Sequence, residues 1–277
     1  MSTNSLLSQI PRNLAGKTVL ITGASSGIGR STAFEFSRTQ PDINLILAAR
    51  RIETVQEVAK EIEAESGGRT KVLALKLDVS DLAAVKRFWE VEVPREWKER
   101  GVDVLVNNAG GVRGLEHVGE IAEEDVATMI GVNVMGLIGL TQHVVRHFKN
   151  DRGGKGDIVN IGSIAGREPY AGGSIYCATK AAVRSFSDSL RRENISNQIR
   201  VIEIDPGQVE TEFSVVRFRG DKAKADAVYA GCDPLGPEDI AGVIVFAVGQ
   251  RQGVVLADSL IFPQHQAGAG AVYKRPA

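Results

Sequence analysis

The chain has 277 residues, of which 43% are hydrophobic, enough for one large α/β domain or two small ones. Its 33 basic residues nearly balance 34 acidic ones, so the net charge of −1 gives no electrostatic reason to expect nucleic acid or an acidic membrane surface as a partner. The only two cysteines, Cys177 and Cys232, predict no disulfide framework and suit a reducing compartment.

Residues 1–16 are expected to be an N-terminal extension of the domain. The stretch from Met1 to Asn13 is polar, contains Pro11 and lacks the apolar centre of a signal peptide. No apolar run in the chain is expected to be long enough to span a bilayer. These features favour a soluble cytoplasmic protein with no membrane partner.

The first predicted strand is a short, apolar, β-rich run at residues 17–22. It leads directly into the glycine-rich stretch Gly23-Ala-Ser25-Ser26-Gly27-Ile28-Gly29, which is followed by a helical pattern. Between a strand and a helix, glycines allow a tight turn and let main-chain N–H groups approach a pyrophosphate. The spacing G-x-x-x-G-x-G differs from the more usual G-x-G-x-x-G, so a purely structural turn is the alternative.

The second predicted strand, residues 44–49, indicates which dinucleotide the site prefers. A site for NAD needs an acidic residue at this strand's end for the ribose 2′-hydroxyl, whereas arginine accommodates a 2′-phosphate. Here Ala49 is followed by Arg50 and Arg51, and a guanidinium can bind a phosphate through two hydrogen bonds. The pattern therefore predicts NADP as the cofactor; the alternative is that both arginines are only solvated.

The remaining pattern alternates helices with strands. Helices are predicted at 53–66, 81–99, 123–150, from 176 onward and at 238–249; further strands are predicted at 71–79, 102–106, 157–161, 199–204 and, at the edge, 259–262. This alternation predicts one doubly wound parallel sheet of about seven strands with helices on both faces, a Rossmann-type fold. The domain is expected to cover 17–262, followed by a tail at 263–277.

The chemistry is expected at Tyr176 and Lys180, which are four residues apart on one helix face. A free phenol has a pKa of about 10, and a nearby ammonium would lower it towards a useful range for a general acid and base. The pair alone is a weak signal. His143 and His147 share a face too, but without a third ligand no metal site is expected.

With these residues in view, the chain resembles the short-chain dehydrogenase/reductase family over nearly its whole length after about Lys17. The matching motifs, in family order, are Thr22-Gly-Ala-Ser-Ser-Gly-Ile-Gly29, Asp78-Val79, Asn107-Asn-Ala-Gly110, Asn133, Ser163, Tyr176-x-x-x-Lys180 and Pro206-Gly-x-Val-x-Thr211. The unusual glycine spacing is typical of this family. Seven motifs in order make the resemblance specific.

The resemblance implies hydride transfer between a nicotinamide and a carbon bearing a hydroxyl or carbonyl group. Tyr176 would be the general acid and base, Lys180 would hold the nicotinamide ribose, Ser163 would bind the substrate oxygen, and Asn133 would hold a water linked to Lys180. The cofactor-binding residues would be Gly23, Ser25, Ser26, Gly27, Ile28, Gly29, Arg50, Arg51, Asp78, Val79, Asn107, Ala109, Gly110, Tyr176, Lys180, Pro206, Gly207, Val209 and Thr211. The family also implies a homotetramer or homodimer built through the helices of Asn133 and Tyr176.

A narrower likeness, in residues 173–180, 209–214, 216–220 and 260–263, is to the NADP-dependent 3-hydroxy acid dehydrogenases, which oxidise serine, L-allo-threonine and related acids. The substrate carboxylate would then need a cationic partner, for which Arg217 is the first candidate and Arg167 the second. Phe213 and Phe218 would form apolar walls beside Ser163 and Tyr176. The alternatives are a broad carbonyl reductase of ketones or β-keto esters and a nucleotide-binding sensor without catalysis.

Overall fold

The apolar runs of the sequence form seven parallel strands of one sheet, in the order β3-β2-β1-β4-β5-β6-β7. The strands are β1 (Thr18–Thr22), β2 (Asn44–Ala49), β3 (Lys71–Lys76), β4 (Val104–Asn107), β5 (Lys155–Ile161), β6 (Gln198–Pro206) and β7 (Asp258–Ile261). The computed structural model describes residues 6–275. Residues 1–5 and 276–277, the outer ends of the predicted extension and tail, lie outside the described part. The fold class predicted from the sequence is confirmed.

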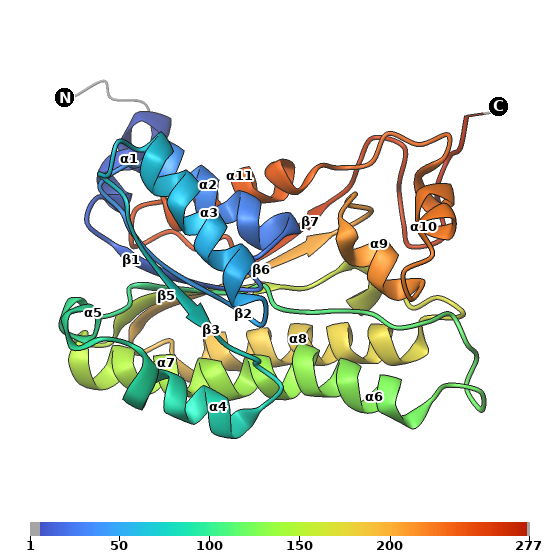
Figure 1. Ribbon diagram of the computed structural model, residues 1–277, viewed down its shortest axis with the longest axis horizontal. Helices are drawn as coiled ribbons and strands as arrows, with labels where there is room; N and C mark the ends of the chain where they lie inside the picture. The colour runs from blue at the N-terminus through green and yellow to red at the C-terminus, as the bar shows by residue number, and fades with distance from the viewer. Residues whose placement is uncertain (1–5, 276–277) are drawn as a thin grey trace.

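Helices cover both faces of the sheet, as Figure 1 shows. On one face lie α1 (Leu6–Leu14), α2 (Gly27–Thr39), α3 (Ile52–Glu65) and α11 (Pro237–Val248); on the other lie α4 (Leu82–Arg87), α5 (Arg95–Arg100), α6 (Glu123–Ile130), α7 (Leu137–Asp151) and α8 (Ser174–Glu193). Each face has its own hydrophobic core, because the central strands bury side chains on both sides. The parallel strands bring their carboxyl ends to one edge of the sheet, where the site is built.

The helix predicted at 81–99 is interrupted, which corrects that expectation. After α4 the chain forms a π-helical turn, η1 (Phe88–Glu92), and α5 begins only at Arg95. Val93 has an extended backbone (ψ 121°) because the residue before a proline avoids the helical region, and Pro94 has no N–H to continue the helix.

Residues Glu123–Asp151 form one long helix in three parts, with the π-helical segment η2 (Gly131–Gly136) joining α6 to α7. By length and composition this helix could cross a membrane, which corrects the expectation that no apolar run was long enough. Its buried residues Leu140, Val144 and Phe148 belong to the core beneath the sheet. Packing inside the fold therefore accounts for part of the apolar character of this helix, while Ile130 and Met135 are exposed.

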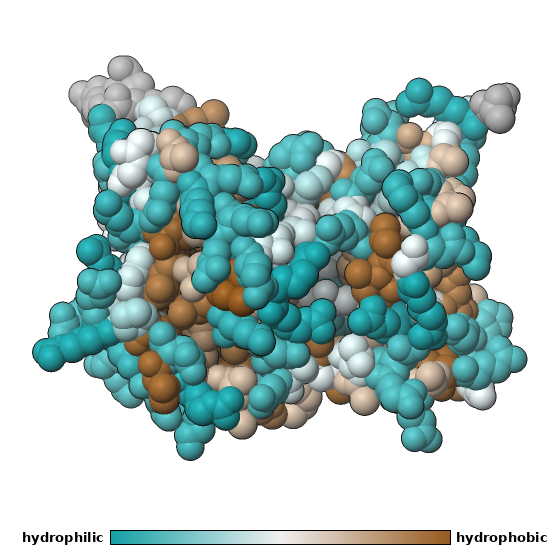
Figure 2. Space-filling view, in the orientation of Figure 1, coloured by the Kyte–Doolittle hydropathy of each residue, from teal (hydrophilic) through white to brown (hydrophobic). Residues whose placement is uncertain are grey.

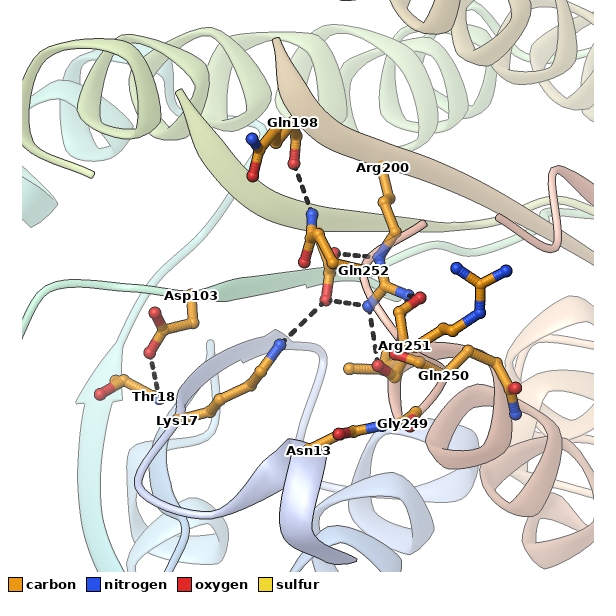
Figure 3. Close-up of polar contacts among 12 residues, drawn as sticks. Asn13, Lys17, Thr18, Asp103, Gln198, Arg200, Gly249, Gln250, Arg251 and Gln252 are labelled. Carbon is orange, nitrogen blue, oxygen red and sulfur yellow. Dashed lines mark hydrogen bonds and ion pairs between the residues drawn. The ribbon is translucent and has the colours of Figure 1, made fainter. Parts of the chain in front are cut away.

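A buried ion pair joins the amino-terminal ends of β5 and β6, at the opposite end of the strands from the site (Figure 3). Arg200 on β6 donates from Nε and Nη2 to the two carboxylate oxygens of Asp157 on β5, both at 2.6 Å. The same guanidinium donates to the main-chain oxygens of Val248 (2.7 Å) and Val254 (3.0 Å), so it also satisfies carbonyls at the end of α11. Nearby, Asn13 of α1 donates to the oxygen of Gly249 at 2.8 Å.

Two short helices, α9 (Glu212–Arg217) and α10 (Lys222–Tyr229), follow β6 and stand beside the carboxyl edge of the sheet (Figure 1). The C-terminal tail folds back over this region, with the N–H of Arg275 donating to the oxygen of Gly231 at 2.8 Å. The face of the molecule in this view is mainly hydrophilic, with apolar residues in separate patches, and its outline dips between the α1–α3 side and the α9–α10 side (Figure 2).

Candidate active site

The glycine turn after β1 is held by close main-chain packing. Gly23 has φ +66°, and a Cβ atom there would lie 2.9 Å from Nδ2 of Asn108. A Cβ atom on Gly29 would lie 2.5 Å from the oxygen of Gly23. Only glycine therefore fits at these two positions, and the turn can lie tightly against Asn108 at the start of α2.

Asn108 fastens this turn to the end of β4, a role that the sequence did not assign to it. Its Nδ2 donates to the main-chain oxygens of Thr22 (2.9 Å) and Gly23 (3.3 Å). The Thr22 hydroxyl accepts in return from the N–H groups of Asn108 and Ala109. The signal was present, because Asn108 lies inside the Asn-Asn-Ala-Gly motif.

The two arginines after β2 differ in their surroundings. Arg51 reaches the glycine turn, where its Nη2 donates to the hydroxyls of Ser25 (3.1 Å) and Ser26 (2.9 Å) and pairs with Glu212 at 3.0 Å. Arg50 is exposed and makes no hydrogen bond or ion pair within residues 6–275. Arg51, the two serines and Glu212 thus form a polar corner beside the turn, in which a phosphate would take the place of the Glu212 carboxylate on the exposed guanidinium.

The predicted residues at the ends of β3 and β4 lie in different environments. Oδ1 of Asp78 accepts from the N–H (3.0 Å) and hydroxyl (2.6 Å) of Ser80, while the following Val79 is buried. Asn107 is also buried, and its amide donates to Thr141 (2.8 Å) and Asn160 (2.9 Å). The Nδ2 group of Asn107 therefore links β4 to β5 and α7 inside the protein.

Asn133 lies in the π-helical segment, where the widened turn presents its amide to the loop after β4. Its Oδ1 accepts from the N–H of Gly111 at 2.8 Å, and its Nδ2 donates to the oxygen of Gly111 (2.9 Å) and to the Thr179 hydroxyl (3.0 Å). Both ends of the amide are thus engaged in fixing the loop of Gly110 and Gly111 against α8.

Ser163, Tyr176 and Lys180 come together although they lie on separate segments. The hydroxyl of Ser163, just after β5, acts on the Tyr176 phenol and favours its ionised form, which by itself would lower the pKa of Tyr176. Lys180 lies one turn along α8, where its Nζ donates to the oxygen of Ile161 at 2.8 Å and lies 5.8 Å from the centre of the Tyr176 ring. A phenol, a hydroxyl and an ammonium therefore share one buried site.

The pKa values of this group correct one expectation. The pKa of Tyr176 is raised, because burial disfavours the phenolate more than the Ser163 hydrogen bond and the charge of Arg217 favour it. The pKa of Tyr176 was expected to lie below its ordinary value, and the net direction is the opposite. Burial itself lowers the pKa of Lys180 to about 8, against the opposing influence of Asp205 and Glu203.

The segment after β6 returns the chain to the glycine turn. Pro206 ends β6, and the N–H of Gly207 donates to the oxygen of Ile261 at 2.8 Å. The oxygen of Val209 accepts from the hydroxyl of Tyr229 at 2.9 Å. A Cβ atom on Gly27 would lie 3.3 Å from Cγ2 of Thr211, so the two predicted cofactor segments face each other.

Helix α9 carries two candidate substrate residues to Tyr176. Thr211 caps the helix by accepting from the N–H of Phe213 at 3.2 Å, and the Phe213 ring packs edge-on against Tyr176 with 5.6 Å between ring centres. Arg217, at the other end of α9, donates to the hydroxyl of Tyr170 (3.3 Å) and to the oxygen of Gly172 (3.2 Å). Arg217 is half-buried, and it forms no ion pair with any carboxylate of residues 6–275.

Arg167 lies in a different setting from Arg217. Its Nε donates to Oδ2 of Asp205 at 2.7 Å, and its Nη2 pairs with Asp258 at the start of β7. Two carboxylates therefore already occupy its guanidinium. This geometry separates the two candidates for a substrate carboxylate and leaves Arg217 as the one with an unmatched charge.

These features together fit a dinucleotide. The glycine turn leads into a 13-residue helix, whose first N–H groups have no partner within the helix, and Arg51, Ser25 and Ser26 stand where strand β2 ends. Tyr176, Lys180 and Ser163 lie at the ends of β5 and α8 across the same edge of the sheet.

Several known proteins are similar to this chain over most of its length. The sequence model of the short chain dehydrogenase family matches residues 17–221. The NADP-dependent 3-hydroxy acid dehydrogenase of Schizosaccharomyces pombe is 53% identical over 264 residues, which cover 95% of this chain and 99% of the relative. The serine 3-dehydrogenase of Agrobacterium fabrum is 33% identical over 253 residues, covering 91% and 96%.

Among solved structures, the closed form of a serine dehydrogenase complexed with NADP+ is 36% identical, with a TM-score of 0.81 over 94% of this chain and 100% of that one. The family match covers more than half of the chain and includes the glycine turn, Ser163, Tyr176 and Lys180. This chain belongs to the short-chain dehydrogenase family.

Proposed function

We propose that the protein is an NADP-dependent dehydrogenase of small 3-hydroxy acids such as serine, L-allo-threonine or 3-hydroxypropanoate- and 3-hydroxybutanoate-type compounds. NADP is supported by Arg51 with its two serine hydroxyls beside the glycine turn, and by the NADP named for the similar fission-yeast enzyme and serine dehydrogenase structure. The presence of a carboxylate on the substrate is inferred from Arg217, which has no anionic partner in the described residues.

When bound, the cofactor supplies or accepts the hydride. In the proposal Tyr176 gives its phenolic proton to the substrate oxygen during reduction and takes it back during oxidation. Ser163 donates a hydrogen bond to the same oxygen as charge develops there. Lys180 contacts the nicotinamide ribose, and Asn133 holds the Gly110–Gly111 loop on which the cofactor rests.

The observation that carries the substrate class is the unmatched charge of Arg217. A half-buried cation normally has an anionic partner, because burial costs free energy that only pairing offsets. Arg217 has only neutral acceptors, all at 3.2–3.3 Å, within the described residues. Its charge also acts on the Tyr176 phenol. A substrate whose reacting oxygen meets Tyr176 would therefore place a nearby carboxylate at Arg217.

Replacing Arg217 by methionine tests this substrate class, because the change keeps most of the bulk and removes the charge. For a free 3-hydroxy acid, kcat/KM should fall by about 2–5 kcal/mol of transition-state stabilisation, whereas for its methyl ester it should change little. Arg219→Met is the matched control, since Arg219 lies two residues away but already pairs with Asp125 and Glu116. It should affect acid and ester equally. Equal losses on both substrates for Arg217→Met would instead favour a broad carbonyl reductase.

The proposal extends to assembly and location. A homotetramer or homodimer is supported by exposed apolar residues on the helices named by the family resemblance, Ile130 and Met135, and near the sheet edge, Phe246 and Leu260. Light scattering on the purified protein would give the number of subunits, and a monomer would contradict this part. A cytoplasmic location is supported by two free cysteines, and cell fractionation would test it.

A further inference from the structure

The carboxylate of Asp205 is buried behind the catalytic group and touches the chain segment that carries Ser163. Asp205, next to the end of β6, is 1% exposed. Its Oδ1 accepts a hydrogen bond from the main-chain N–H of Ser163 at 2.9 Å, and its Oδ2 accepts from Nε of Arg167 at 2.7 Å. The two oxygens thus hold different partners.

The segment around Ser163 is shaped to admit this carboxylate. A Cβ atom on Gly162 would collide with Oδ1 of Asp205, so the absence of a side chain there makes room for the acid. The N–H of Gly162 donates to the oxygen of Ile204 at 2.8 Å, and the oxygen of Ile161 accepts from Lys180. Three consecutive residues ending at Ser163 are therefore fastened to β6 and α8.

The orientation of the Ser163 side chain depends on that fastening. Ser163 has an extended backbone (φ −175°, ψ 156°) and begins a short turn, η3 (Ile164–Gly166), in which its hydroxyl accepts from the N–H of Ala165 at 3.1 Å. The same hydroxyl acts on the Tyr176 phenol, whose ionised form it favours. A change in the position of the Ser163 main chain would therefore move the hydroxyl away from Tyr176.

We propose that Asp205 is a positioning residue, which fixes the Ser163 hydroxyl against Tyr176 through the main-chain N–H of Ser163, and that Arg167 serves to hold the Asp205 carboxylate in place. Arg184 supports the same carboxylate at 3.7 Å, and both arginines are shared with Asp258. Arg167 thus belongs to the support of the site and not to substrate binding. A displacement of about 1 Å at a reacting group can lower the rate by about 100-fold.

The test uses Asp205→Asn, which keeps the shape but has one acceptor oxygen for two donors. Arg167 is charged and will compete for that oxygen, so the Ser163 N–H should lose its partner. Turnover should fall by about 10- to 100-fold while NADPH affinity, measured by fluorescence titration, is unchanged. Asp258→Asn is the control, because it removes the other acid of the same arginines without touching Ser163, and its turnover should stay within about twofold of wild type.

A double-mutant cycle with Ser163→Ala then separates positioning from general structural support. If Asp205 acts through the Ser163 hydroxyl, Asp205→Asn should cost less than about threefold once that hydroxyl is gone. The proposal would be overturned if the turnover losses of Asp205→Asn and Ser163→Ala multiplied in full in the double variant. It would also be overturned if Asp205→Asn and Asp258→Asn lost turnover equally. Hydrogen exchange on the wild-type protein provides a check that needs no folded variant: the Ser163 amide should exchange as slowly as those of β5, and fast exchange would overturn the proposal as well.

This inference rests on the proposed function only for the choice of assay. If 3-hydroxy acids are not substrates, the wild-type enzyme will show no activity with them. The double-mutant cycle is then run with a carbonyl compound that the wild-type enzyme does reduce with NADPH. A wrong substrate class can therefore be distinguished from a wrong role for Asp205.

Discussion

The ammonium nitrogen of Lys180 lies 5.8 Å from the centre of the Tyr176 ring, with both side chains buried on one face of α8. Burial is the largest influence on the ionisation of both groups. The pKa of the phenol rises above its ordinary value and that of the ammonium falls to about 8. The site therefore holds a neutral phenol and a mainly protonated lysine at neutral pH.

The raised pKa of Tyr176 predicts how reduction depends on pH. In the proposed mechanism reduction needs the protonated phenol, and a pKa above the ordinary value keeps it protonated throughout the neutral range. The kcat for carbonyl reduction with NADPH should therefore be constant between about pH 6 and 7.5. A pH series with saturating substrate checks this, and a decline across that interval would mean that the phenol ionises near neutrality.

Lys180→Met should separate activity from stability. In the folded protein Lys180 loses its proton near pH 8 instead of 10.5, so the folded state binds fewer protons than the unfolded state between these values. Keeping the charge buried therefore costs stability below pH 8, at most on the order of 3 kcal/mol, and this cost disappears as the pH rises to 10.5. The variant should lose turnover yet melt at or above the wild-type temperature at pH 7.

The advantage of the Lys180→Met variant should shrink as the pH approaches 10. Thermal unfolding of both proteins at pH 7 and pH 10 makes this comparison. A variant that melts well below wild type at pH 7 would show that the Lys180–Ile161 hydrogen bond outweighs the burial of the charge.

Cofactor choice should depend on Arg51 more than on Arg50. Arg51 is directed at the glycine turn by Ser25 and Ser26, whereas Arg50 has no such partner in the described residues. Arg51→Met should raise the Kd for NADPH by about 10-fold or more and leave that for NADH nearly unchanged. Arg50→Asp should also favour NADH, by repelling the phosphate. Fluorescence titration with both cofactors measures this, and equal affinities in the wild-type protein would contradict the assignment of NADP.

The ion pair of Arg200 and Asp157 should matter for folding and not for chemistry. Asp157→Asn leaves the buried guanidinium without its charge partner and should lower the free energy of unfolding by about 3–5 kcal/mol. The exposed pair of Arg69 and Asp42 has similar geometry, so Asp42→Asn is a matched control that should leave the denaturation midpoint almost unchanged. Urea unfolding measures the denaturation midpoints of both variants. Equal shifts of the two midpoints would show that burial does not make the Arg200–Asp157 pair more stabilising than the exposed pair.

The sequence predicted the strands and the glycine turn because short apolar runs and glycine spacing are local signals. The break before Pro94 was missed because the apolar spacing continues through it, although the residue before a proline avoids the helical region. The helix Glu212–Arg217 was missed because its six residues are too few to show a helical periodicity. The direction of the Tyr176 pKa could not be read from residue spacing, because burial sets it. The roles of Asn108 and Asp205 depend on which main-chain atoms they reach, which only the folded chain shows.

The most direct test of the central claim is Tyr176→Phe, which keeps the ring packed against Phe213 and removes only the phenolic hydroxyl. NADPH affinity, measured by fluorescence titration, should stay near the wild-type value, while kcat for carbonyl reduction should fall by about 100-fold or more. Unchanged cofactor affinity together with turnover near the wild-type rate would contradict the assignment of Tyr176 as the general acid and base.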